Sequence, residues 1–385
     1  MTEPPPGLSV ESLLVEATSR ASLDDWGDQG FVRTLELLVE SCRQTAALNA
    51  LGWDVLHKVL LRHLRNRLYL QAHLTSHPDA VVPVEAPVVI TGLPRTGTTL
   101  LHNLLALDPA NRVLRFWEAL HPLPPDPARG TSEEALAAKA EVWLERLYAL
   151  APGFRAIHGA TARGPEECDA LLQNSFASQH FDDMFAATAY SAWLSHASLA
   201  DEYAYYAVQL GVLSGPPPGV ARQWVLKSPS HLGYLDTLLA TFPHAVVVHC
   251  HRHPVEAIGS YASLVEAVRG PYTDSLALAD VGAHAIERCE VATRRALKVR
   301  EGAGPAPFVD VGYRDLVADP LAMVRRLYVH LGRELEPSTT ASMATWLADN
   351  PQHKHGRHRY TLERFGLSPE VVLKGLGDYA DRFPV

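Results

Sequence analysis

The residues with the clearest chemistry lie in the stretch GLPRTGTT (residues 92–99), which directly follows the apolar run VVIT. A phosphate-binding P-loop requires Gly, four further residues, Gly, Lys and then Ser or Thr, and here Thr98 replaces the lysine. That lysine contacts the β- and γ-phosphates of a nucleoside triphosphate, so its absence argues against an ATPase. Arg95 supplies a planar, always-charged donor group inside the loop. The loop therefore predicts a site for a smaller anion, held without a metal ion.

The sequence on both sides of this loop has the pattern that phosphate binding requires. The preceding run is short and β-branched, as in a buried strand, and TTLLHNLLAL (98–107) has helical spacing. A helix N-terminus directs unpaired N–H groups and the positive end of its dipole at the loop. Gly92 and Gly97 allow the backbone to approach an anion closely, and Thr98 and Thr99 add hydroxyl donors. The alternative is a glycine turn that binds nothing.

Two further predicted strands are followed by basic residues. RQWVL (222–226) precedes Lys227, and AVVVHCH (245–251) precedes Arg252, with Ser260 about two turns into the next helix. Ligands of doubly wound parallel sheets bind at the carboxyl ends of strands, so these side chains are candidates for phosphate contacts. The simpler alternatives are a surface exit for Lys227 and a local cap or ion pair for Arg252.

The sequence HCHRH (249–253) raises the question of a metal site. Neighbouring residues of a strand alternate between its faces, so His249 and His251 would share one face and Cys250 would point to the other. No second pair of ligand residues with matching spacing accompanies them, and we expect no metal here.

The rest of the chain supplies the elements that position these residues. Predicted strands at 86–92, 222–228, 245–251 and 307–313 alternate with helices, which indicates a parallel sheet. We predict an α/β fold, a P-loop-type parallel sheet of about four or five strands flanked by helices, with helical insertions. The predicted organisation is a helical N-terminal segment (1–84), packed on or lidding the core, and an α/β domain (85–385).

The N-terminal segment contains a basic amphipathic helix. Residues 51–74 repeat leucine at helical spacing, and the other face carries Lys58, Arg62 and Arg65. Such a helix can lie on a membrane surface. The simpler interpretation, which we adopt, is a helix packed on the core with a solvated basic side.

Composition limits the classes of function. The chain has 385 residues, 47% of them hydrophobic, and its net charge of -9 argues against general nucleic-acid binding. The four cysteines are far apart, as expected of buried thiols in a reducing compartment. No signal peptide and no apolar stretch of membrane-spanning length is evident, so we expect a cytoplasmic protein without stable membrane insertion. Homo-oligomerisation is left open.

Together these motifs resemble the sulfotransferases that use 3′-phosphoadenosine 5′-phosphosulfate (PAPS), in particular a bacterial branch of that family. PRTGTT resembles the family's 5′-phosphosulfate loop, and VLKSPSHL (225–232) resembles its second strand–helix unit. Arg252 and Ser260 match the Arg and Ser that hold the 3′-phosphate. GYRDLVADP (312–320) is similar to a segment that lies by the nucleotide, and HKHGRHRYTLERFGL (353–367) is similar to a C-terminal loop.

The resemblance implies a set of donor contacts and catalytic groups. The donor contacts would be Arg95, Thr96, Gly97, Thr98, Thr99, Arg252, Ser260, Tyr313, Arg357 and Arg359. Arg357 and Arg359, with Lys354, stand where eukaryotic cytosolic members have an R-K-G motif, which is absent here. Lys227 would neutralise the bridging oxygen, Arg95 would contact the sulfuryl group, PAP would be the product, and no metal is expected.

The general base has one preferred candidate and several alternatives. Glu118, in RFWEALHP, follows the helix of the loop by a short connection, as the catalytic Glu does in Golgi-type relatives. The alternatives are Glu166, Glu167, His121 and His158.

The acceptor is predicted from the helical insertions. The aromatic-rich segment 173–194 favours a small apolar acceptor, such as a lipid or phenol, sulfated on a hydroxyl rather than an amine. One alternative function is a P-loop small-molecule kinase, for which Asp310 is the acidic candidate for a magnesium ligand. The other is a non-catalytic nucleotide-binding protein, which would bind PAP without transferring a sulfuryl group.

Overall fold

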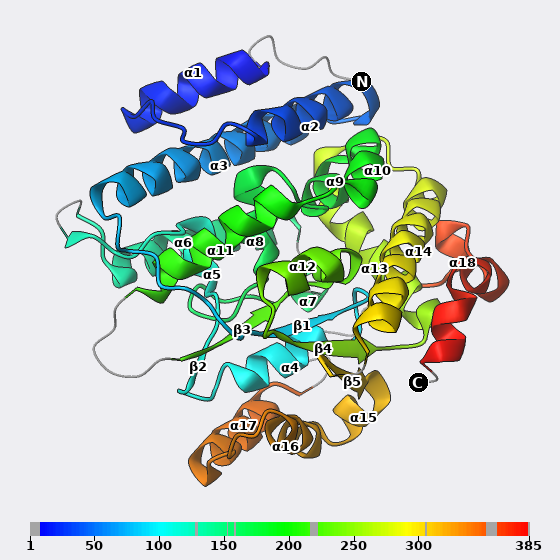
Figure 1. The fold of residues 1–385 in the computed structure, drawn as a ribbon. Helices are drawn as coiled ribbons and strands as arrows, with labels where there is room; N and C mark the ends of the chain where they lie inside the picture. Colours follow the sequence, from blue (N-terminus) through cyan, green and yellow to red (C-terminus); the bar gives the residue numbers. More distant parts are fainter. Residues whose placement is uncertain are drawn as a thin grey trace.

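A five-stranded parallel sheet forms the centre of the computed structural model, which describes residues 8–127, 130–151, 153–157, 159–215, 222–304, 306–351 and 360–383 (Figure 1). The strands are β1 (Val88–Gly92), β2 (Asn111–Arg112), β3 (Gln223–Lys227), β4 (Val246–His251) and β5 (Phe308–Gly312). Their order is β2-β3-β1-β4-β5, and every neighbouring pair is parallel. The predicted α/β fold is confirmed. The sequence missed β2 because it is a two-residue edge strand in a turn-rich segment.

Helices cover both faces of this sheet. The first are α1 (Val10–Ala21), α2 (Phe31–Thr45) and α3 (Ala50–Ser76). Between β1 and β3 lie α4 (Thr98–Leu105), α5 (Phe116–Leu120), α6 (Glu133–Leu150), α7 (Phe154–Ile157), α8 (Asp169–Leu172), η2 (Gln173–Ser175), α9 (His180–Phe185), α10 (Thr188–His196) and α11 (Ala200–Ser214). Beyond β3 lie η3 (Pro229–Tyr234), α12 (Leu235–Thr241), α13 (Pro254–Arg269), η4 (Gly270–Tyr272), α14 (Leu278–Ala303), α15 (Tyr313–Ala318), α16 (Pro320–His330), α17 (Pro337–Asp349), η5 (Glu363–Phe365) and α18 (Pro369–Arg382).

The core divides into two layers because strand side chains alternate between the faces of the sheet. Val88 and Ile90 of β1 belong to a cluster with leucines of α4 and with residues of α16 and α17. Val89 belongs to the larger cluster, which includes residues of α3, α11, α13 and α14. All five residues of β1 are buried, as expected of a central parallel strand.

The strand register brings three strand ends to one edge of the sheet. Ile90 pairs with Lys227 of β3, and Gly92 pairs with Cys250 of β4. The loop after β1 therefore lies between the ends of β3 and β4. The predicted basic residues at these two ends thus flank the predicted anion loop.

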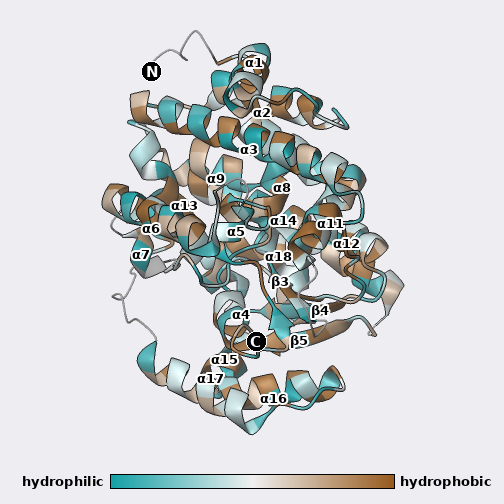
Figure 2. Ribbon diagram, turned by 90° about the vertical axis from the view of Figure 1, so that its left-hand side faces the viewer, coloured by the Kyte–Doolittle hydropathy of each residue, from teal (hydrophilic) through white to brown (hydrophobic). Residues whose placement is uncertain are grey.

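The N-terminal helices form a layer on one side of the molecule (Figure 1). Ser9 caps the start of α1, since its side chain accepts a hydrogen bond from the Ser12 N–H at 3.1 Å. Hydrophobic and hydrophilic residues alternate along α3 (Figure 2), and its leucines join the larger core cluster. The segment packs on the rest of the chain through this shared core, while a division at residue 85 stays a prediction. No helix in the described ranges is long and apolar enough to cross a membrane.

Candidate active site

The loop between β1 and α4 has a backbone that depends on its two glycines. Gly92 and Gly97 have φ of 150° and 88°, a region that favours glycine, and Arg95 adopts φ of 71°. A Cβ on Gly92 would lie 2.2 Å from the carbonyl oxygen of Cys250, and one on Gly97 would lie 3.1 Å from a ring carbon of Tyr313. α4 begins directly after the loop, so its first N–H groups are available to a ligand there.

Two arginines meet at this loop. The Arg95 Nε donates to the Ser260 hydroxyl at 3.2 Å, and an Arg252 guanidinium nitrogen donates to the Arg95 carbonyl at 3.1 Å. The Arg252 guanidinium also lies 4.3 Å from the ring centroid of Tyr313 and donates to Glu256 at 3.0 Å. Burial and the neighbouring Arg252 charge lower the pKa of Arg95. The structure thus brings together four of the predicted donor contacts in a site suited to an anion.

Lys227 and Glu167 form the next part of the site. Lys227 is only 2% exposed, and its Nζ lies 2.6 Å from the Glu167 Oε1. The Cys168 N–H donates to the Lys227 carbonyl at 3.0 Å, which holds the segment containing Glu167 against the end of β3. Burial, followed by the positive charge of Lys227, lowers the pKa of His102 to about 3, so His102 is neutral. A buried cation and a half-exposed carboxylate therefore lie together beside the loop.

Glu118 lies elsewhere. Its carboxylate accepts two hydrogen bonds from Arg112, at 2.9 and 2.5 Å, and a third from the Arg115 N–H at 2.8 Å. The last of these bonds caps the start of α5. Glu118 is 5% exposed and does not line the cavity described below. Its role as a base stays a prediction, which these contacts disfavour because they already use both carboxylate oxygens.

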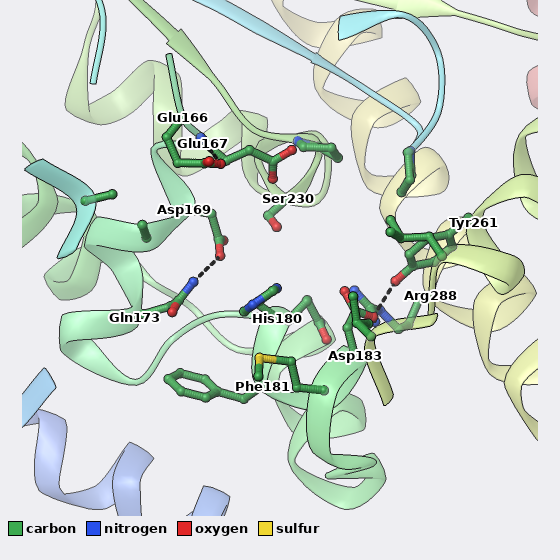
Figure 3. Close-up of a pocket in the computed structure, with 18 of the residues that line it drawn as sticks. Glu166, Glu167, Asp169, Gln173, His180, Phe181, Asp183, Ser230, Tyr261 and Arg288 are labelled. Atoms are coloured by element: carbon green, nitrogen blue, oxygen red, sulfur yellow. Dashed lines mark hydrogen bonds and ion pairs between the residues drawn. The ribbon is translucent and has the colours of Figure 1, made fainter. Parts of the chain in front are cut away.

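A cavity of about 270 Å³ opens beside Lys227 and Glu167. Figure 3 shows Glu166, Glu167, Asp169, His180 and Ser230 around one part of it, with the Asp169 carboxylate directed at Gln173. The Asp169 Oδ1 is buried and has no hydrogen-bond partner among the described residues, and burial raises the pKa of this carboxyl. Further walls are apolar and include Leu93, Phe116, Trp143, Leu147, Phe181 and Met184. The cavity thus combines a polar zone with an apolar lining.

The sequence analysis missed some residues of this cavity and assigned others only in part. Asp169 belongs to no motif and was signalled only by its place after Glu166 and Glu167, whereas Ser230 lies within VLKSPSHL and His180 within segment 173–194, without a role being assigned to either. In the aromatic segment, Phe181 and Met184 line the cavity, whereas Phe176 and Tyr190 are buried in the core. The segment is therefore partly pocket and mostly core.

Of the remaining predicted residues, some lie outside the described part of the chain and one does not line the cavity. Arg357, Arg359, Lys354 and His158 lie outside the described residues. His121, which follows α5, is not among the lining residues, and burial together with the charges of Arg62, Lys139 and Arg65 lowers its pKa to about 4.

The HCHRH segment forms a hydrogen-bonded network behind the site. His249 and His251 share one face of β4 as predicted, and with Asp310 they are the described residues whose ligand atoms cluster closely enough to hold an ion. Arg300 already bonds to His249 at 3.2 Å and to Asp310 at 2.8 Å. The Phe383 ring stacks on His251. These contacts fasten α14 and the C-terminal residues to the sheet and suit a structural network.

The family model described as "Sulfotransferase family" matches residues 87–337, which contain the loop, Lys227, Arg252 and Tyr313. The chain belongs to the sulfotransferase family. The solved sulfotransferase STF1 from Mycobacterium tuberculosis H37Rv superposes with a TM-score of 0.83 at 30% identity, covering 96% of this chain and 98% of STF1. STF9 from Mycobacterium avium gives 0.85 at 28% identity, covering 100% and 99%. The predicted resemblance to bacterial sulfotransferases is confirmed.

A further relative is similar to this sulfotransferase over only part of its length. The omega-hydroxy-beta-dihydromenaquinone-9 sulfotransferase Stf3 of Mycobacterium bovis is 27% identical over 165 residues. That match covers 41% of this chain and only 40% of the relative.

Proposed function

We propose that this sulfotransferase transfers a sulfuryl group from PAPS to a hydroxyl of an apolar acceptor. The observation that carries the proposal is the meeting of Arg95, Arg252 and Ser260 at a P-loop without its lysine. Like charges held this close favour an anionic ligand between or beside them. The loop and the N-terminus of α4 would bind the 5′-phosphosulfate, and Arg252 and Ser260 would bind the 3′-phosphate, with Tyr313 alongside. Arg357 and Arg359 stay predictions for the same ligand.

The reaction assigns three tasks to the chain. The acceptor oxygen forms a bond to sulfur, the bond from sulfur to the bridging oxygen of PAPS breaks, and PAP keeps that electron pair. Arg95 would stabilise the sulfuryl oxygens, and the Lys227 ammonium would neutralise the bridging oxygen as charge develops there. The acceptor proton must pass to a base within hydrogen-bond reach.

Glu167 is the base that the geometry supports best. It lines the cavity and lies 2.6 Å from Lys227, so one ion pair would position both the base and the group that neutralises the leaving phosphate. Glu118 would first have to release Arg112. Glu166 is the nearest alternative in the chain, but its Oε1 accepts the Glu167 N–H at 2.7 Å. We therefore assign the base to Glu167.

The apolar lining supports an apolar body for the acceptor. The curated relative is named for an acceptor that is an omega-hydroxylated menaquinone, a lipid with a terminal hydroxyl. A comparable class for this chain, a hydroxyl at the end of an apolar chain or ring, would place the hydroxyl at the polar zone near Glu167. The apolar remainder would contact Phe116, Trp143 and their neighbours.

The contacts of Asp310 argue against the kinase alternative, for which it was the candidate magnesium ligand. Asp310 bonds to His251 at 2.8 Å and to Arg300 at 2.8 Å, so both its oxygens are engaged. Although burial opposes it, these two partners lower the pKa of Asp310. A magnesium site at Asp310 would have to displace a guanidinium.

Thermal unfolding of the purified protein tests the donor. PAP with EDTA should raise the melting temperature, because a ligand that binds only the folded state stabilises it. Arg252→Ala should remove most of that shift, whereas Arg325→Ala on α16, which makes no donor contact in this proposal, should keep it. A shift given only by ATP with magnesium would overturn the proposal in favour of the kinase. PAP binding without any transfer, across an acceptor series of alcohols and phenols, would favour the non-catalytic alternative.

A further inference from the structure

α3 carries two arginines whose charges have no counter-ion among the described residues. Within the described part of the chain, Arg62 bonds to the neighbouring His63 ring at 3.2 Å, and Arg65 bonds to the Tyr69 hydroxyl at 3.1 Å. The Nε atoms of both are buried and have no hydrogen-bond partner among the residues that the structure describes. By contrast, Lys58 on the same helix is exposed and paired with Asp54 at 2.6 Å. In the sequence the three residues belong to one basic face of the helix, but in the structure Lys58 is exposed and paired, whereas Arg62 and Arg65 are partly buried and have no counter-ion among the described residues.

Arg62 faces the acceptor cavity. It lines the cavity together with Val59 of its own helix and with Phe116, Leu120 and Trp143 across it. Burial lowers the pKa of Arg62 to about 10, still far above neutrality, so the guanidinium stays charged. Arg62 is partly buried, and a desolvated charge without a counter-ion is costly, so an anionic group of a ligand would stabilise it.

Two other basic residues, Arg65 and Lys139, act on His121 together with Arg62, although neither lines the cavity itself. α3 is held against the end of α5 by a hydrogen bond from Asn66 to the Leu120 carbonyl at 3.3 Å, which places Arg62 and Arg65 near His121. Burial is the largest cause of the low pKa of His121, followed by the charges of Arg62, Lys139 and Arg65. Cations from α3 and α6 therefore converge on one residue, and no described carboxylate forms an ion pair with any of the three.

We propose that Arg62, supported by Arg65 and Lys139, binds an anionic group of the acceptor, a phosphate or a carboxylate attached to its apolar body. This inference rests on the proposed function for the role of the cavity. The acceptor is then an anionic amphiphile with three parts: a hydroxyl near Glu167, an apolar body along the cavity lining, and an anionic group at α3. The basic side of α3 is thus part of a binding site as well as a solvated surface.

Calorimetric titration with three short amphiphiles of equal chain length tests the proposal without any sulfuryl donor. Octyl phosphate and octanoate should bind wild-type protein about tenfold more tightly than octanol, as one added charge-assisted hydrogen bond predicts. Arg62→Gln should abolish this preference and leave octanol binding unchanged. Lys58→Gln, on the same helix but already paired with Asp54, should keep the preference and is the matched control.

Two further variants keep the result interpretable. Arg65→Gln and Lys139→Gln should each reduce the preference for the anionic compounds, and they serve if circular dichroism shows that Arg62→Gln is unfolded. Equal binding of octanol and octyl phosphate by wild type would overturn the proposal. So would a preference that survives Arg62→Gln, or one that Arg252→Ala removes, because the anion would then occupy the donor loop.

The anionic group could belong to a dissolved amphiphile or to a membrane lipid, and a second experiment, which measures binding to vesicles, distinguishes the two. A dissolved amphiphile predicts tight binding of octyl phosphate and no Arg62-dependent binding to vesicles. A membrane lipid predicts binding to phosphatidylcholine vesicles only when they contain phosphatidic acid, again lost in Arg62→Gln. Because neither arm needs PAPS, a failure here leaves the PAP result intact, and a failure of PAP to bind leaves this result intact.

Discussion

Glu167→Gln and Glu118→Gln should separate catalysis from stability. Glu118 is 7% exposed at its side chain, and Arg112 is 15% exposed, so the pair is buried. Removing one partner of a buried pair costs about 3–5 kcal/mol, because the other charge is left uncompensated. Glu167 is 31% exposed, but its partner Lys227 is only 2% exposed, so Glu167→Gln should also cost about 1–3 kcal/mol. The two variants are therefore distinguished by turnover, and the free energy of unfolding serves as the control.

The assay pairs urea unfolding with turnover of PAPS under saturating acceptor. Glu167→Gln should lower kcat roughly 100- to 10,000-fold, the usual contribution of a general base, with PAP binding retained. Glu118→Gln should lower the free energy of unfolding and keep kcat within about tenfold of wild type at a temperature where it stays folded. A folded Glu118→Gln that is inactive, beside an active Glu167→Gln, would refute this reasoning and return the base to Glu118.

Three further predictions follow from single contacts. Arg252→Ala should weaken PAP binding roughly 10- to 100-fold in calorimetry, the cost of one lost hydrogen bond to a charged group, and an unchanged affinity would remove Arg252 from the site. Gly97→Ala should weaken PAP binding by about tenfold or more, since φ of 88° strains alanine and its Cβ meets the Tyr313 ring; wild-type affinity would show that the loop adapts. Burial lowers the pKa of both His102 and His231 to about 3. As the pH falls below 6.5, the free energy of unfolding should therefore decrease, with a slope that approaches about 2.7 kcal/mol per pH unit for the two residues together. The sign follows because the unfolded chain takes up protons that the folded chain excludes, and a flat urea midpoint from pH 7 to about pH 5 would contradict it.

Local patterns were sufficient to predict most elements of the fold. The four longer strands and the loop before α4 were predictable because β-branched runs, glycines and leucine spacing lie within a few residues of one another. β2 was not, because two residues carry no periodicity, and it forms only by pairing with β3. The first turns after β3 form a 3-10 helix rather than the expected α-helix, with the Ser228 hydroxyl accepting the Ser230 N–H. Such differences depend on local hydrogen bonds that a hydrophobic pattern does not specify.

The site was predictable to the extent that its residues follow strands. That Arg95, Lys227 and Arg252 lie at one edge of the sheet was predictable because strand ends of a parallel sheet share an edge. Glu167 was one of several candidate bases, because its position depends on a backbone hydrogen bond between Cys168 and Lys227 across 59 residues of sequence. The separation of Arg62 from Lys58 was equally hidden, since the two lie four residues apart on one basic face and differ only in what packs against them.

The strand order explains how a P-loop without its lysine could still bind an anion. In a nucleotide hydrolase the cation comes from the loop itself. Here β1 lies between β3 and β4. β3 ends at Lys227, and Arg252 directly follows the end of β4. Positive charge is therefore supplied from both flanks of the loop, by strands that are more than 120 residues later in the sequence, as the numbering shows. Two separated cations suit a ligand with two separated anionic groups, whereas a single lysine suits a compact triphosphate. Lys227 itself is buried, but Glu167, which pairs with it, lines the cavity, so in the proposed function this ion pair would connect the donor site with the acceptor site.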